Sequence, residues 1–300
     1  MAAEVLGELK KGYHTPVLLT EAVEGLITAR EGLYVDATFG GGGHSRAILA
    51  RLGPKGRLMG LDCDPEAPLD SLQDPRFMPL RGNFRYLGAL LAQQGIQEVT
   101  GILADLGVSS HQLDTPQRGF SYRWAAPLDL RMNPNEGQPA WEWLRQQSPE
   151  TLAYYLREYG EVPYSRRLAR RLKAALRPHF STQDLRACIE AVYGPAARRY
   201  LAPVFQALRI AVNDELNALA EFLAQTTSLV RPRGRLVLLT YHSGEARLVK
   251  AHQRQLLWAD PLTGAKTYAW RLLAKSRPSP QERAANPRSR SATLWILERL

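Results

Sequence analysis

The run of four glycines from Gly40 to Gly43 is the feature of the sequence that most clearly suggests chemistry. It follows segment 32–38, which reads as a strand, and it precedes an apolar-periodic segment that ends at Leu52 and reads as a helix. Because glycine has no Cβ, the backbone N–H groups of such a loop and of the helix start can approach an anionic ligand closely. The pattern predicts a site for a nucleotide-like ligand.

An acidic residue follows at the matching place in the next predicted strand. Asp62 ends segment 57–62, where a carboxylate can accept hydrogen bonds from both hydroxyls of a ribose. A loop that only turns the chain would not need this acid. A dinucleotide enzyme is a rival interpretation, but its glycine pattern requires glycine or alanine where Ser45 stands. S-Adenosylmethionine suits the loop and the acid at least as well.

Other residues of catalytic type lack such a pattern. Cys63 and Cys188 lie far apart and neither follows a proline, so they predict no disulfide, no zinc site and no Pro-Cys nucleophile. The six histidines lack the spacing of metal ligands, and we expect no metal site. His111 and His242 follow predicted strands, where each is either a site residue or a hydrogen-bonded part of the scaffold.

The hydrophobic pattern predicts the scaffold that positions these residues. Further β-rich segments follow at 76–80, 101–108 and 235–241, with helical segments between them. Such alternation predicts an α/β fold with a mostly parallel sheet covered by helices on both faces. Segments 266–273 and 292–299 read as two closing strands around a loop rich in proline and arginine.

The alternation stops between residues 113 and 211, which indicates an insertion. A turn-rich stretch is followed there by helices at 150–159, 165–176 and 182–192, and a helix at 214–229 returns to the sheet. We therefore expect three parts: 1–114 as the first part of the core, 115–210 as an inserted helical substrate-binding domain, and 211–300 as the second part of the core.

Composition and charge narrow the function class. With 45% hydrophobic and 23% charged residues, the 300-residue chain is neither disordered nor fibrous. Its net charge of +10 predicts contact with a polyanion, either nucleic acid or an acidic membrane surface. Apolar runs fall short of the ~18 residues of a membrane span and the N-terminus lacks a signal-peptide core, so we expect a cytoplasmic protein.

The positive charge is concentrated in two regions. Segment 157–209 holds eleven Lys and Arg against four Asp and Glu, and segment 271–299 holds seven against two. These residues either contact RNA phosphates or form a solvated surface. The candidate RNA-binding residues are Arg166, Arg167, Arg170 and Arg171 on one predicted helix, and Arg288 and Arg290 in the terminal loop.

Several blocks of the sequence resemble the RsmH (MraW) family, and the resemblance runs from about residue 13 to the end. They begin at His14 (HTPVLL), Tyr34 (YVDATFGGGGHS), Asp105 (DLGVSSHQLD), Arg118 (RGFSY), Pro127 (PLDLRM), Phe205 (FQALRIAVNDEL) and Asn286 (NPRSRS). The resemblance implies a class I, Rossmann-like methyltransferase core with a late antiparallel strand and an inserted helical domain. It also implies methylation of N4 of a cytidine in 16S ribosomal RNA, within the small ribosomal subunit, with S-adenosylmethionine as cofactor.

The resemblance also implies which residues hold the cofactor. Phe84 can pack on the adenine face, and Asp62 can take the ribose. Asp105 can accept hydrogen bonds from the N4 hydrogens, although the Pro-Pro-aromatic element that accompanies such an acid in many amino-methylating enzymes is missing; holding the cofactor is its alternative role. The implied cofactor residues are Gly42, Gly43, His44, Asp62, Phe84, Asp105 and Gln112.

Two segments depart from the family pattern. Where the family has His-Ser-Leu-Glu-Asp-Arg, segment 242–247 has Gly244 and Ala246, and segment 200–204 lacks the family's arginine. We expect these altered segments to face the RNA. The sequence leaves open a methyltransferase for another RNA, a ribosome-assembly factor without turnover, and the oligomeric state, a homodimer included.

Overall fold

The computed structural model describes residues 16–259 and 266–300, which form two compact units; His14 lies outside the described residues. The first unit runs to Gly107 and resumes at Ala218, and the second comprises Val108–Asn217. The domain limits expected at 115 and 210 fall inside the second unit. No helix within the described ranges is long and apolar enough to cross a membrane.

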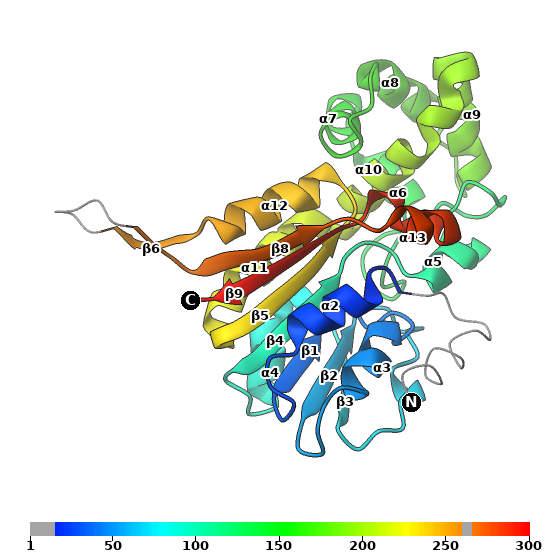
Figure 1. The fold of residues 1–300 in the computed structure, drawn as a ribbon. Helices are drawn as coiled ribbons and strands as arrows, with labels where there is room; N and C mark the ends of the chain where they lie inside the picture. The colour runs from blue at the N-terminus through cyan, green and yellow to red at the C-terminus, as the bar shows by residue number, and fades with distance from the viewer. Residues whose placement is uncertain (1–15, 260–265) are drawn as a thin grey trace. The chain divides into compact units, whose positions relative to one another are not determined.

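The first unit is built on a seven-stranded sheet with the order β3-β2-β1-β4-β5-β9-β8 (Figure 1). Strands β1 to β5 are parallel, and β9 pairs antiparallel with both β5 and β8. This is the mostly parallel sheet with a late antiparallel strand that was expected. The strands are β1 (Leu33–Asp36), β2 (Arg57–Asp62), β3 (Phe77–Arg81), β4 (Val99–Asp105), β5 (Val230–Thr240), β8 (Trp270–Ser276) and β9 (Thr293–Arg299).

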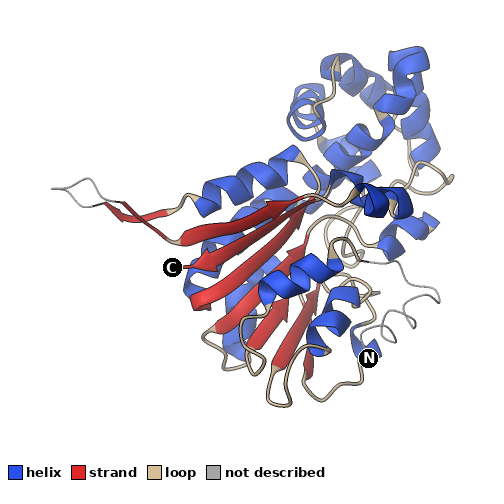
Figure 2. Cartoon of the chain, in the orientation of Figure 1, coloured by secondary structure: helices blue, strands red, loops and turns tan. Residues whose placement is uncertain are grey.

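Helices cover both faces of this sheet, because its central strands are apolar on both sides (Figure 2). Tyr34 and Leu103 pack in one core with α2 (Leu19–Leu26) and α3 (Gly43–Leu49). Their neighbours Val35 and Ile102 pack in a second core on the opposite face. That face is covered by α4 (Leu87–Gln93), α11 (Glu215–Leu229) and α12 (Ser243–Gln253).

The closing part of the chain differs from the sequence prediction. Segment 266–273 is not one strand: β7 (Lys266–Tyr268) pairs with β6 (Leu256–Ala259) in a separate two-stranded sheet, and β8 begins only at Trp270. The division falls at Ala269, which is fully buried and donates its N–H to the Gln255 carbonyl at 3.0 Å. The loop before β9 contains α13 (Pro280–Ala285) and the 3-10 helix η5 (Pro287–Ser291).

The second unit is helical and has its own core, as expected of the insertion. The predicted helices are α7, α8 and α9, and the amphipathic pattern of α8 buries Leu168 and Leu172. The helices of the unit are α5 (Ser110–Asp114), α6 (Ala140–Gln146), α7 (Pro149–Gly160), α8 (Ser165–Ala175), α9 (Thr182–Tyr193) and α10 (Leu201–Asn213), with the 3-10 helices η3 (Pro116–Arg118) and η4 (Gly194–Arg199).

In the departure at 200–204, Ala202 is exposed while two of its neighbours are buried, so the expectation that this segment faces RNA stays a prediction. Leu201 and Val204 lie in the first turn of α10 and are buried in the core of the second unit. Ala246, at the other departure, packs against the core of the first unit from α12. These positions therefore contribute to packing.

Tyr34 provides a test of how the turn before β1 is held. Its buried hydroxyl accepts the N–H groups of Thr28 and Ala29 at 3.0 and 2.9 Å and donates to the Ala29 carbonyl at 2.9 Å. Tyr34→Phe removes the shared partner of these backbone groups, so we expect a loss of about 1–3 kcal/mol in the free energy of unfolding. Urea denaturation measures it, with Tyr164→Phe, at an exposed ring, as control. Equal urea midpoints for the two variants would contradict this account.

Candidate functional site

The glycine loop joins β1 to α3 in a conformation that only glycine adopts easily. Gly40 and Gly42 have φ angles of 53° and 76°, in the left-handed region. A Cβ on Gly42 would lie 2.6 Å from the Phe39 ring, and one on Gly43 would lie 2.2 Å from the Pro16 ring. Glycine is therefore required for the path of the loop, and the first N–H groups of α3, which lack partners within the helix, are the groups that an anionic ligand can use.

Asp62 lies directly against this loop. One carboxylate oxygen accepts the Gly40 N–H at 2.7 Å, and the other accepts the Asp64 N–H at 2.9 Å. The side chain is partly buried, and burial raises its pKa. The structure therefore brings the glycine loop and the acid at the end of β2 together, with the carboxylate oriented by two backbone groups.

Asp36, at the end of β1, is a buried acid that the sequence interpretation missed. It is fully buried, which raises its pKa, and it accepts a hydrogen bond of 2.7 Å from the Ser45 hydroxyl and one of 3.3 Å from the Thr38 N–H. Ser45 is the residue that breaks the dinucleotide glycine pattern. Its hydroxyl satisfies the buried carboxylate, so the serine has a function in this loop that glycine or alanine could not supply.

Asp105 ends β4 and lies near the same loop. Its backbone N–H donates to Thr38 Oγ1 at 2.6 Å, and its Oδ1 accepts the Tyr241 hydroxyl at 2.6 Å. The side chain is 25% exposed. Burial raises the pKa of Asp105 to about 7, the Tyr241 hydrogen bond opposes this rise, and the charge of Glu245 adds to it. The carboxyl group therefore changes its protonation near neutral pH.

His44 is brought close to Asp105, but its ring has an internal partner. Nε2 lies 3.3 Å from the Val17 carbonyl, and Nδ1 lies 3.8 Å from Oδ2 of Asp105. Burial lowers the pKa of His44, so the ring is neutral near pH 7. With Nε2–H donated to Val17, the ring has no second N–H for a ligand. The group of His44 that can donate a hydrogen bond to a ligand is its backbone N–H, in the first turn of α3.

The two remaining predicted cofactor residues lie in different units. Phe84 follows β3 in the 3-10 helix η2 (Phe84–Tyr86) of the first unit, half-buried and edge-on to Phe222 at 5.2 Å between ring centroids. Gln112 lies in α5 of the second unit, where its Oε1 accepts the Ser109 N–H at 3.0 Å and its N–H donates to the Ser109 hydroxyl at 3.1 Å. Gln112 therefore caps its own helix.

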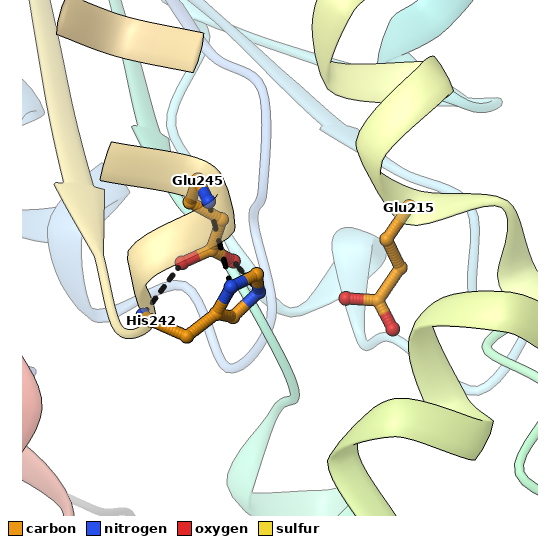
Figure 3. A group of neighbouring side chains, drawn as sticks. All are labelled: Glu215, His242 and Glu245. Atoms are coloured by element: carbon orange, nitrogen blue, oxygen red, sulfur yellow. Dashed lines mark hydrogen bonds and ion pairs between the residues drawn. The ribbon is translucent and has the colours of Figure 1, made fainter. Parts of the chain in front are cut away.

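His242 and Glu245 form a capping box at the start of α12 (Figure 3). Glu245 is buried and accepts the N–H groups of Tyr241 and His242 at 2.6 and 3.2 Å. His242 is thus a hydrogen-bonded part of the scaffold. Glu215, also drawn in Figure 3, belongs to the second unit, where its carboxylate pairs with Arg209 at 2.7 and 2.9 Å.

The candidate RNA-binding arginines are mostly exposed. Arg166, Arg167, Arg170 and Arg171 all lie on the exposed faces of α8, and Arg290 is exposed in η5. Arg288 is half-buried. Lys173 of the same helix instead donates to the Leu144 and Arg145 carbonyls at 3.3 and 2.8 Å, which ties it to α6.

The strand order and the edge formed by the glycine loop, Asp62 and Asp105 define the class I methyltransferase fold, in which ligands bind at the carboxyl ends of parallel strands. Comparison with known protein families supports this class. Residues 11–300 match the MraW methylase family. The chain therefore belongs to this family and is an S-adenosylmethionine-dependent methyltransferase.

Named relatives and a solved structure are similar over nearly the whole chain. Ribosomal RNA small subunit methyltransferase H of Parabacteroides distasonis is 45% identical, covering 96% of this chain and 98% of that protein. The protein of the same name from Methylibium petroleiphilum is 40% identical, with 95% of each chain covered. The crystal structure of an rRNA methylase from Streptococcus thermophilus is 12% identical, with 94% of this chain and 93% of that chain covered and a TM-score of 0.40.

The residues at this edge fit S-adenosylmethionine. Side chains at Gly42 and Gly43 would collide with Phe39 and Pro16, so only glycine lets the loop take this path, and the loop carries no Cβ there that would cover a ligand approaching the backbone. Asp62 presents an oriented carboxylate for ribose hydroxyls. Asp36 and Asp105 place further carboxyl groups near the loop, and a cationic sulfonium is stabilised by negative charge.

Gly42→Ala should weaken S-adenosylmethionine binding about tenfold or more, because the methyl group must displace Phe39 from the loop. Gly95→Ala is the matched control: Gly95 has a similar φ of 71°, but a Cβ there meets nothing within 4 Å. Both variants carry the same backbone strain, so isothermal titration calorimetry isolates the effect on the loop. Equal affinities of the two variants for S-adenosylmethionine would contradict the assignment of the glycine loop to cofactor binding.

Proposed function

We propose that this protein transfers a methyl group from S-adenosylmethionine to N4 of a cytidine in 16S ribosomal RNA of the small ribosomal subunit, in the cytoplasm. The observation that carries the proposal is Asp105, held by Tyr241 at the end of β4 near a glycine loop suited to the cofactor. The names of the relatives, which act on small-subunit ribosomal RNA, support the substrate class.

The difficulty of the reaction lies in the nucleophile. The lone pair of the cytosine amino group is delocalised into the ring, so N4 attacks poorly unless it is aligned and its hydrogens are held by acceptors. S-Adenosylmethionine supplies an electrophilic methyl group on its sulfonium. The protein must therefore supply a hydrogen-bond acceptor and exact placement of N4 in line with that methyl group.

Asp105 is our candidate for this acceptor. Its Oδ1 holds the Tyr241 hydroxyl, so Oδ2 is the oxygen that we assign to an N4–H. Only the ionised carboxylate accepts this hydrogen bond fully, and it also takes up the proton that N4 loses when the methyl group arrives. A carboxyl group with a pKa of about 7 can perform both steps near neutral pH.

The basic surfaces provide contacts for the RNA backbone. Among the described residues, no carboxylate pairs with Arg166, Arg167 or Arg170, so these guanidinium groups are available for phosphates. In the first unit, Arg283 and Arg290 line a surface hollow together with Pro280 and Ala284. We assign both groups to the binding of ribosomal RNA.

The first test is a transfer assay with labelled S-adenosylmethionine and small subunits from a strain that lacks this enzyme, followed by nucleoside mass spectrometry. Wild-type protein should produce labelled N4-methylcytidine. Asp62→Ala should lose about tenfold or more in cofactor affinity, because it removes the oriented carboxylate.

Three outcomes distinguish the alternatives. Label in another nucleoside would indicate another methylation site or another RNA as substrate. Tight cofactor and subunit binding without any label would indicate an assembly factor that has lost turnover. Label in N4-methylcytidine from free 16S RNA alone, and none from assembled subunits, would contradict the assembled subunit as substrate.

The pH dependence tests the role of Asp105. Because its pKa is raised to about 7, the carboxyl group is mostly protonated at pH 6 and ionised at pH 8. We expect kcat/KM to rise with pH and to level off above about 7, and Asp105→Asn to lose both the rise and most of the activity. Tyr241→Phe removes the hydrogen bond that lowers this pKa, so its profile should shift to higher pH. A profile that is unchanged in Tyr241→Phe would assign the titration to another group.

A further inference from the structure

Within the described ranges, the small sheet formed by β6 and β7 is covered on neither face. Every residue of both strands is exposed, although Leu256, Leu257, Trp258 and Tyr268 are large and apolar; Trp258 is 55% exposed. Figure 1 shows β6 extending away from the seven-stranded sheet beyond β8. A two-stranded sheet is barely stable by itself in water, and exposed apolar groups on it indicate a contact surface.

The pairing register places one aromatic ring on each face. Leu256 lies opposite Tyr268 and Trp258 lies opposite Thr267, because the register shifts between Leu256 and Trp258, so two steps along β6 match one step along β7. Because successive residues of a strand point to opposite faces, the Tyr268 ring and the Trp258 ring point in opposite directions. The element can therefore offer a flat ring on each face to a partner that surrounds it.

The charge around these strands favours a polyanion as that partner. Residues 250–275 contain five Lys and Arg and one Asp. Arg271 pairs with Glu298, and the Lys275 ammonium lies 4.2 Å from the centroid of the Trp295 ring. Lys250, Arg254 and Lys266 pair with no carboxylate among the described residues. Aromatic rings among unpaired cations are the combination that binds unpaired bases together with their phosphates.

The position of the element in the first unit separates it from the cofactor edge. Strand β8 is antiparallel to β9, which is antiparallel to β5, so β8 runs parallel to β5. The two short strands precede β8 and therefore lie at the amino end of the parallel strands, whereas Asp62 and Asp105 lie at the carboxyl ends. The seven residues of β8 alone span roughly 23 Å.

We propose that the sheet β6–β7 is a second RNA-binding element, with Trp258 and Tyr268 stacking on unpaired bases and Lys250, Arg254 and Lys266 binding phosphates. It contacts ribosomal RNA at a place remote from the target cytidine. This proposal rests on the proposed function for the identity of the RNA. It implies that the element contributes to recognition of a whole small subunit and not of a short RNA around the target.

Kinetics with two substrates test the proposal. The double variant Trp258→Ala with Tyr268→Ala should raise KM for small subunits about tenfold or more, with kcat, cofactor affinity and thermal stability unchanged. Its activity on a short RNA hairpin that contains the target cytidine should equal that of wild type. The variant Trp258→Phe with Tyr268→Phe keeps both rings and should restore KM. Leu273→Ala, at an exposed apolar residue of β8, is the matched control.

A crosslinking experiment identifies the partner directly. Benzoylphenylalanine placed at position 258 should form adducts with 16S RNA in purified small subunits upon irradiation. Adducts with a ribosomal protein, or with a second copy of this chain, would overturn the proposal, and so would an unchanged KM in the alanine double variant. The crosslink does not depend on methylation, so absence of N4-methylcytidine from the wild-type assay would reject the proposed function while the adduct still decides on this element.

Discussion

The buried carboxylate of Asp36 is the constraint on which the rest of the cofactor edge depends. A fully buried acid must be hydrogen-bonded, and its partners are Ser45 in the first turns of α3 and the backbone of Thr38. These bonds fix the chain on both sides of the glycine loop. Thr38 in turn accepts the Asp105 N–H, which connects the loop to the end of β4. The loop geometry and the position of Asp105 therefore follow from one satisfied buried charge.

This edge of the sheet is acidic although the chain as a whole is strongly basic. The net charge is +10, yet Asp36, Asp62, Asp105 and Glu245 gather at or just beyond the ends of β1, β2, β4 and β5. A cationic sulfonium is favoured at this acidic edge, and we propose that the arginines of α8 and the cations near β6 and β7 attract the RNA instead. Binding of the cation would also lower the pKa of Asp105 and favour its ionised form when the cofactor is bound.

The sequence predicted those parts of the fold and the site that depend on residues close together in the chain. The glycine loop and Asp62 were found because strand, loop, helix and acid follow one another within thirty residues or so, and the helices of the insertion were found from their apolar period. Thr38 and Tyr241 were missed because their roles arise from contacts with Asp105, which is distant from both in sequence. Asp36 was missed although its partners Thr38 and Ser45 are near in sequence, because the sequence does not show that its carboxyl group is buried. At 200–204, Leu201 and Val204 pack inward from α10 while Ala202 is exposed, and a substitution alone does not reveal these directions.

The sequence interpretation did not separate β7 from β8, and the two strands differ in how their apolar side chains are covered. Strand β8 is an edge strand, and the bulge between Leu272 and Ala274 disrupts its regular edge, which protects against pairing with another chain. The pairing of β6 with β7 has a register shift as well, between Leu256 and Trp258, but among the described residues its apolar side chains face water on both sides. Large apolar side chains exposed on both faces imply that this small sheet contacts a partner, and the cations around it that pair with no carboxylate among the described residues favour RNA as that partner.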